Sequence, residues 1–109
     1  MQWSEKILHS FGDGNDDGQG ADSNLLLNSS GNLDGTTYAG GTYGKATAFA
    51  LTPTASGNWA ETVLHSFDLN GEDEIIPYAG LIADGSGNLY STTGYGGTSD
   101  DGTVFVVVR

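Results

Sequence analysis

The chain has 109 residues, enough for one small domain, and its 18 glycines and 37% apolar residues are typical of a turn-rich globular protein. Fourteen Asp and Glu against three Lys and Arg give a formal net charge of −11, which excludes nucleic-acid partners because a phosphate backbone would be repelled. Cysteine is absent, which excludes disulfides and thiolate metal sites, and no apolar run is long enough for membrane insertion.

The first element along the chain is a phrase that occurs twice. WSEKILHSF at residues 3–11 returns as WAETVLHSF at residues 59–67. Residues 3–53 laid over residues 59–109 without a gap share 19 identities in 51 positions. We therefore divide the chain into two units with a period of 56, residues 1–58 and residues 59–109, within one continuous β domain.

The elements of both units are predicted to be strands. Apolar residues do not recur at helical spacing for more than a turn, and Gly, Thr, Ser and Asn interrupt the chain too often for helices. Clusters of Gly, Asp and Asn separate short β-branched runs, and DGSGN at 84–88 has the glycines of a tight hairpin. In chain order we expect strands at 5–11, 23–28, 32–37, 47–52, 61–67, 78–84, 88–93 and 103–108.

The second unit carries a family resemblance. GLIADGSGNLYSTTGYGGTSDDGTVFVV at 80–107, followed cyclically by W-x-E-x-x-LHSF, resembles the GloVer-type tandem repeat of bacterial secreted or surface proteins. Ser91 and Asp34 replace the family's usual Gly and Tyr. The resemblance implies a propeller-like all-β fold and an extracellular or cell-surface location, although the opening MQWSEKIL is not a signal peptide. The family has no established activity that the resemblance could assign to this chain.

The expected strands do not divide evenly into four-stranded antiparallel blades. Residues 23–67 supply one complete blade, residues 78–108 supply three strands of another, and residues 5–11 are the missing fourth strand. Two blades cannot close a ring, because propellers have about four to eight blades. Two full periods are 2 × 56 = 112 residues, so the ends of two chains would meet within a loop equivalent to residues 53–58. We therefore expect strand exchange between chains.

In this exchange the N-terminal strand of one chain pairs with the C-terminal strand of a neighbour. Such a contact is head-to-tail, so the homo-oligomer is a closed ring or a filament. An alternative is that the chain is part of a longer array whose other units complete both ends. The residues assigned to the exchanged strands are Glu5, Ile7, Leu8, Phe11, Thr103, Val104, Phe105, Val106, Val107 and Val108.

His-Ser pairs at 9–10 and 65–66 are the strongest candidates for catalysis, but they do not support it. A Ser directly after a His in a strand points to the opposite face, so the two side chains cannot share a hydrogen bond. Both pairs also stand at equivalent positions of the two units, as packing within a repeat predicts. We therefore predict a non-enzymatic protein with no catalytic residues.

Acidic loops follow both LHSF phrases and are candidate calcium sites. DGNDDG at 13–18 matches the start of a calcium-binding loop, but Asn24 stands where an EF-hand needs Glu. An isolated calcium loop and a solvated acidic turn both stay open. We expect assembly to require no cofactor. If the chain binds a metal ion, these loops indicate Ca²⁺. The candidate ligands are Asp13, Asn15 and Asp17 in the first loop and Asp68, Asn70 and Glu72 in the second.

Aromatic residues beside amide and carboxylate groups offer a second function. Such platforms suit sugar rings, and one site in each unit would give a lectin-like, multivalent binder of glycans. A Trp at a strand start also packs one unit against the next, so the pattern has a purely structural explanation. The candidate sugar-binding residues are Trp3, Trp59 and Tyr95.

Overall fold

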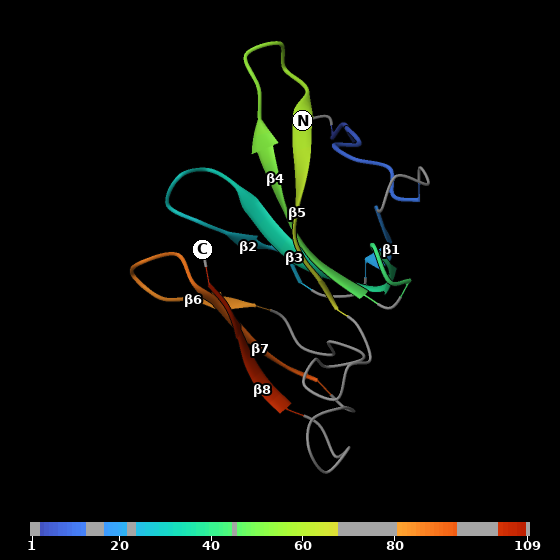
Figure 1. The fold of residues 1–109 in the computed structure, drawn as a ribbon. Helices are drawn as coiled ribbons and strands as arrows, with labels where there is room; N and C mark the ends of the chain where they lie inside the picture. The colour runs from blue at the N-terminus through green and yellow to red at the C-terminus, as the bar shows by residue number, and fades with distance from the viewer. Residues whose placement is uncertain are drawn as a thin grey trace.

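The protein is described by a computed structural model. It describes residues 3–12, 17–21, 24–44, 46–67, 81–93 and 103–108. Over these ranges the chain is all-β, with eight strands in two antiparallel sheets (Figure 1). Among the same residues, no helix has the length and apolar character needed to cross a membrane.

The first sheet contains the complete four-stranded unit predicted between residues 23 and 67. Strands β2, β3, β4 and β5 pair consecutively and antiparallel, and the short strand β1 pairs with β3 beyond the end of β2. Two short strands therefore share one edge of β3. The bounds are β1 (Gly18–Ala21), β2 (Leu26–Leu27), β3 (Leu33–Gly40), β4 (Ala46–Pro53) and β5 (Trp59–Phe67).

The second sheet has three strands in the order β6-β7-β8, formed by Ile82–Ala83, Leu89–Thr93 and Thr103–Val107. Its register repeats that of the first sheet. Leu33 pairs with Leu51 across β3 and β4, and the residues 56 positions later, Leu89 and Val107, pair across β7 and β8.

The hairpins before β3 and before β7 have the same turn geometry. The side chain that opens each turn, Asn28 or Asp84, accepts hydrogen bonds from the backbone N–H groups two and four residues later. The glycine three residues on, Gly31 or Gly87, has a φ of 82° or 85°. The hairpin predicted for residues 84–88 is therefore present, with glycine where the backbone enters the left-handed region.

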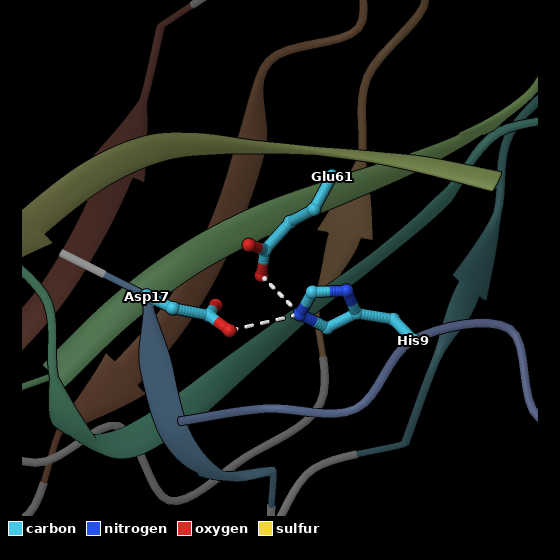
Figure 2. A group of neighbouring side chains, drawn as sticks. All are labelled: His9, Asp17 and Glu61. Atoms are coloured by element: carbon cyan, nitrogen blue, oxygen red, sulfur yellow. Dashed lines mark hydrogen bonds and ion pairs between the residues drawn. The ribbon is translucent and has the colours of Figure 1, made fainter. Parts of the chain in front are cut away.

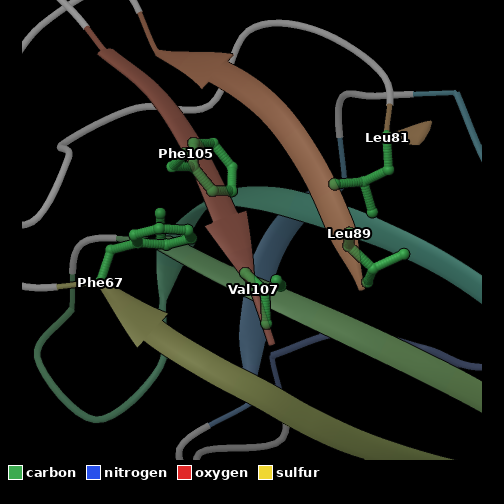
Figure 3. Close-up of a cluster of buried hydrophobic side chains, with 7 residues drawn as sticks. Phe67, Leu81, Leu89, Phe105 and Val107 are labelled. Atoms are coloured by element: carbon green, nitrogen blue, oxygen red, sulfur yellow. The ribbon is translucent and has the colours of Figure 1, made fainter. Parts of the chain in front are cut away.

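The core lies between the two sheets. Phe67 at the end of β5 packs edge-on against Phe105 of β8, with ring centroids 5.3 Å apart, and Leu81, Leu89 and Val107 lie on the same side of the second sheet (Figure 3). Leu26 and Leu64 pack against this cluster from the first sheet. The buried members of the cluster are Ala46, Ala48, Phe67, Leu81, Leu89, Phe105 and Val107.

Residues 3–12, which we call the N-terminal segment, form no strand in the single chain. The strand predicted at 5–11 is absent here because the segment joins neither sheet ladder. It lies instead across the first sheet: the Phe11 ring is 5.1 Å from the Phe49 ring, and Lys6 Nζ donates to the Gly57 carbonyl oxygen over 2.7 Å.

Three strands differ most from the prediction. The strand expected at 23–28 is only the two-residue β2, because β1 occupies the rest of the β3 edge. The strand expected at 78–84 is the two-residue β6, and residues 78–80 lie outside the described part of the chain. Strand β1 has no predicted counterpart, because its sequence GQGA contains no β-branched residue.

Candidate functional site

The N-terminal segment lies on the first sheet much as β5 lies on the second. In both LHSF phrases the His ring lies edge-on to the Phe ring two residues later, at centroid distances of 4.6 Å and 4.5 Å. Phe11 then contacts Phe49, and Phe67 contacts Phe105, at 5.1 Å and 5.3 Å. The contacts made by the N-terminal segment are thus reproduced 56 residues later by β5.

Strand β8 presents an edge that has no partner strand among the described residues. Phe105 and Val107 face the core, whereas Val104, Val106 and Val108 alternate with them and are exposed. A groove of about 330 Å³ runs beside this edge. Its walls are Leu64, His65, Phe67 and the C-terminal residues 105–108.

A comparison with β4 shows how unusual this exposure is within the chain. Ala48 and Ala50 of β4 are 0% and 5% exposed. Their counterparts 56 residues later, Val104 and Val106, are 80% and 46% exposed. The small residues are buried and the larger apolar ones are not, because the face of β4 that carries Ala48 is covered by the second sheet and the same face of β8 is open.

The two groups of residues predicted to assemble are therefore not brought together within one chain. Glu5 and Ile7 are exposed on the N-terminal segment, and Leu8 and Phe11 are half-buried against the first sheet. Residues 103–108 form β8 and its end in the other sheet.

A cluster of three titratable side chains holds the N-terminal segment to the first sheet (Figure 2). His9 Nε2 lies 3.0 Å from Asp17 Oδ2 and 3.4 Å from Glu61 Oε2. His9 comes from the N-terminal segment, Asp17 directly precedes β1, and Glu61 is the third residue of β5. One ligand atom from each residue lies within 4.8 Å of the other two.

The environment of the cluster keeps Asp17 ionised. Burial raises the pKa of the Asp17 carboxyl, but side-chain hydrogen bonds with Glu61 and His9, the charge of His9 and the Gly12 N–H together lower it below its usual value. Asp17 Oδ2 accepts from the Gly12 N–H over 3.1 Å, and Oδ1 accepts from the Gly18 N–H over 2.8 Å. The carboxylate is thus fixed by backbone donors on both oxygens.

Sequence reasoning assigned the members of this cluster to different roles. From the sequence, His9 is predicted to pack in the repeat and Asp17 to belong to a calcium loop, and Glu61 appears only as a possible orienter in the rejected catalytic interpretation of the His-Ser pairs. The equivalent positions of Glu5 and Glu61 in the two phrases were the available signal, but nothing in the sequence indicates that residues 44 positions apart meet.

Most of the residues predicted to bind calcium or sugar lie outside the part of the chain that the structure describes. Asp13, Asn15, Asp68, Asn70, Glu72 and Tyr95 lie outside the described residues. Of the rest, Trp3 is almost fully exposed on the N-terminal segment, and Trp59 is half-buried at the start of β5. A groove of about 450 Å³ between the 28–32 and 85–87 turns is lined by neither Trp. Calcium binding and sugar binding stay predictions.

Comparison of the chain with protein-family models, with curated proteins and with solved structures found no match. The resemblance to the GloVer-type repeat, and the propeller architecture that it implies, stay predictions.

Proposed function

We propose that the protein is a non-enzymatic structural protein that assembles head to tail. In this proposal the N-terminal segment of one chain adds a fourth strand to the β6-β7-β8 sheet of a second copy. The carrying observation is the repeated contact: the N-terminal segment lies on the first sheet as β5 lies on the second, yet only β5 is part of a ladder. An open acceptor edge and a segment that joins no ladder thus occur in the same chain.

The pairing of β4 with β5 supplies a template for the register between chains. Moving both strands of that pair along by one period places β8 in the role of β4 and the N-terminal segment of a second copy in the role of β5. The pairs Thr47↔Ser66, Ala50↔Thr62 and Leu51↔Glu61 become Thr103↔Ser10, Val106↔Lys6 and Val107↔Glu5.

The exposed valines favour this association energetically. When the second copy adds its strand, its own first sheet comes with it, because the N-terminal segment is packed on that sheet through Phe11 and Phe49. This sheet would cover Val104 and Val106 as the second sheet covers Ala48 and Ala50. Full burial of one Val is worth about 1.5–3 kcal/mol, and main-chain hydrogen bonds to the β8 edge add to it.

The proposal includes a propeller-like arrangement of four-stranded blades, and both a closed ring and an open filament are compatible with it. A head-to-tail contact repeats around a ring when its rotation closes, and otherwise continues as a filament. Three chains would supply six blades and four would supply eight, within the range of about four to eight found in propellers. The extracellular or cell-surface location implied by the family resemblance belongs to the same proposal.

Cysteine cross-linking tests the register, because the chain has no cysteine of its own. Lys6→Cys and Val106→Cys would be made in separate chains, mixed in equal amounts and oxidised. We expect a disulfide-linked dimer that neither variant forms alone, and a ladder of larger species or a covalent ring when both substitutions are in one chain. Non-reducing electrophoresis measures both.

Two controls make the result specific. Ala50→Cys with Thr62→Cys reports the equivalent pair inside one chain, where the disulfide should form without changing the mass. Ile7→Cys with Val106→Cys is out of register by one residue, so its side chains face opposite sides of the sheet. Absence of the Lys6–Val106 dimer while the internal pair cross-links would refute the proposal.

A further inference from the structure

The cluster formed by His9, Asp17 and Glu61 has a second property that packing alone does not require. Its three donors converge from three separated parts of the chain, and the distances from His9 Nε2 to the two carboxylate oxygens are 3.0 Å and 3.4 Å. Neighbouring ligands of a tetrahedral Zn²⁺ with bonds of about 2.0–2.1 Å are about 3.4 Å apart. The two distances from His9 Nε2 are therefore close to those between ligands of a small divalent cation, and all three donor atoms lie within 4.8 Å of one another.

The charge of the cluster points the same way. Two carboxylates and one imidazole meet at a site where the Asp17 side chain is only 3% exposed. Carboxylates withdrawn from water need compensation, which here is a proton on His9, a proton held in the hydrogen bond between Glu61 and Asp17, or a bound cation. With both carboxylates ionised, an imidazolium leaves the cluster with one net negative charge, whereas a divalent cation with neutral imidazole makes it neutral.

The donor set narrows the choice of cation. An imidazole nitrogen with two carboxylate oxygens suits the borderline first-row cations, whereas Ca²⁺ prefers six to eight oxygen ligands. The Gly12 and Gly18 N–H groups already hold the Asp17 carboxylate in a fixed orientation, as outer hydrogen bonds do around metal ligands.

We propose that His9, Asp17 and Glu61 bind one borderline divalent cation of the Zn²⁺ class, with the remaining coordination position taken by water. This site shares Asp17 with the calcium loop predicted at 13–18, but its other two ligands, His9 and Glu61, lie outside the predicted calcium loops. The bound cation ties the N-terminal segment to β5. Any effect of the cation on the pairing of the N-terminal segment with a second copy rests on the proposed assembly. The cation site itself does not.

The test uses the full chain, with any purification tag removed and with metals stripped by a chelator. Zn²⁺ would be titrated calorimetrically, and retained zinc would be counted by elemental analysis after dialysis. We expect one Zn²⁺ per chain that is lost in His9→Asn, and at least about tenfold weaker binding in Glu61→Gln. Co²⁺ in place of Zn²⁺ would report nitrogen and oxygen ligation through its visible absorption.

Asp84→Asn is the matched control, because it removes a carboxylate of a distant, exposed hairpin and should leave zinc binding unchanged. Circular dichroism of each variant separates loss of the site from loss of the fold. Zinc binding that is absent, or that is equal in the wild type, His9→Asn and Glu61→Gln chains while all are folded, would overturn the site.

Light scattering of the same samples separates this inference from the proposed function. Zinc binding that needs His9 in a chain that stays monomeric would support the site and contradict assembly. Assembly of a chain that binds no zinc would contradict the site and leave the head-to-tail proposal standing.

Discussion

At the scale of single residues, buried hydroxyl groups in both sheets are satisfied in the same way. Thr37 Oγ1 lies 2.8 Å from Thr47 Oγ1 and accepts the Thr47 N–H over 3.1 Å. Thr93 and Thr103 reproduce these contacts at 2.9 Å and 3.1 Å. An unsatisfied buried donor would cost about 1–3 kcal/mol, so these threonines stabilise the end of each β-ladder as a pair and not singly.

Tyr90 and Asp84 form a titrating pair in the β6–β7 hairpin. The hydrogen bond from the Tyr90 hydroxyl to Asp84 Oδ2, at 2.8 Å, is the largest cause of the lowered pKa of the Asp84 carboxyl, and the Ser86 and Asn88 N–H groups lower it further. The same hydrogen bond raises the pKa of the Tyr90 phenol. The pair therefore stabilises the hairpin only while Asp84 is ionised and Tyr90 is protonated.

We expect Tyr90→Phe to raise the pKa of Asp84 towards its ordinary value of 3.8, because the largest stabilising hydrogen bond to the carboxylate is lost. In the wild type the carboxylate contributes stability above pH 3.8, and this contribution is lost as the pH falls through the lower, folded-state pKa. NMR titration of the Asp84 carboxyl carbon measures both chains. An unchanged pKa in Tyr90→Phe would show that the backbone donors alone set it.

At the scale of elements, the edge of the first sheet depends on the close approach of β1 to the end of β3. Gly18 pairs with Gly40, and Gly40 has a φ of 85°. A Cβ at Gly40 would lie 2.5 Å from the Asp17 carbonyl oxygen and 2.8 Å from the Gln19 nitrogen, both of which are backbone atoms. Glycine is therefore required both by the conformation and by the space.

We predict that Gly40→Ala lowers the free energy of unfolding by about 2–5 kcal/mol, from left-handed strain of about 1–2 and overpacking of about 1–3 kcal/mol. Gly31→Ala is the control, because Gly31 has a φ of 82° but nothing within 4 Å of the added Cβ. It should cost only the strain, about 1–2 kcal/mol. Urea unfolding of both variants measures the difference, and equal losses would contradict the crowding at Gly40.

The elements show how far the sequence predicts this fold. The all-β class, the 84–88 hairpin and the four antiparallel strands within residues 23–67 follow from local patterns of turn residues and β-branched runs. The short β1 and the cluster at His9 do not, because they depend on contacts between distant residues. The spacing of apolar residues, whether it repeats every two or every 3.6 residues, does not indicate that Asp17 and Glu61 will be neighbours.

At the scale of the whole molecule, charge opposes association while the apolar edge of β8 favours it. The chain carries a net charge of −11, so copies repel one another at long range. The five residues of β8 are all uncharged, and its exposed valines lie on one face. The proposed assembly is therefore held by short-range contacts against a screened long-range repulsion.

We accordingly expect assembly to strengthen with ionic strength. The screening length falls from about 30 Å at 0.01 M salt to about 8 Å at 0.15 M, which removes most repulsion between exposed charges of neighbouring chains. Sedimentation velocity at a fixed protein concentration should show more assembled protein at 0.15 M than at 0.01 M. A decrease would mean that ion pairs, and not apolar contacts, hold the chains together.

The recurrence of the LHSF phenylalanine contacts at a spacing of 56 residues has a consequence for how such a protein can evolve. Phe11 on Phe49 and Phe67 on Phe105 are the same boundary at two places in the chain. An in-frame duplication of one period in the coding sequence would therefore insert a unit whose two faces already match its neighbours. In the proposed assembly, a longer gene and a larger number of subunits would be two ways of supplying the same repeated unit.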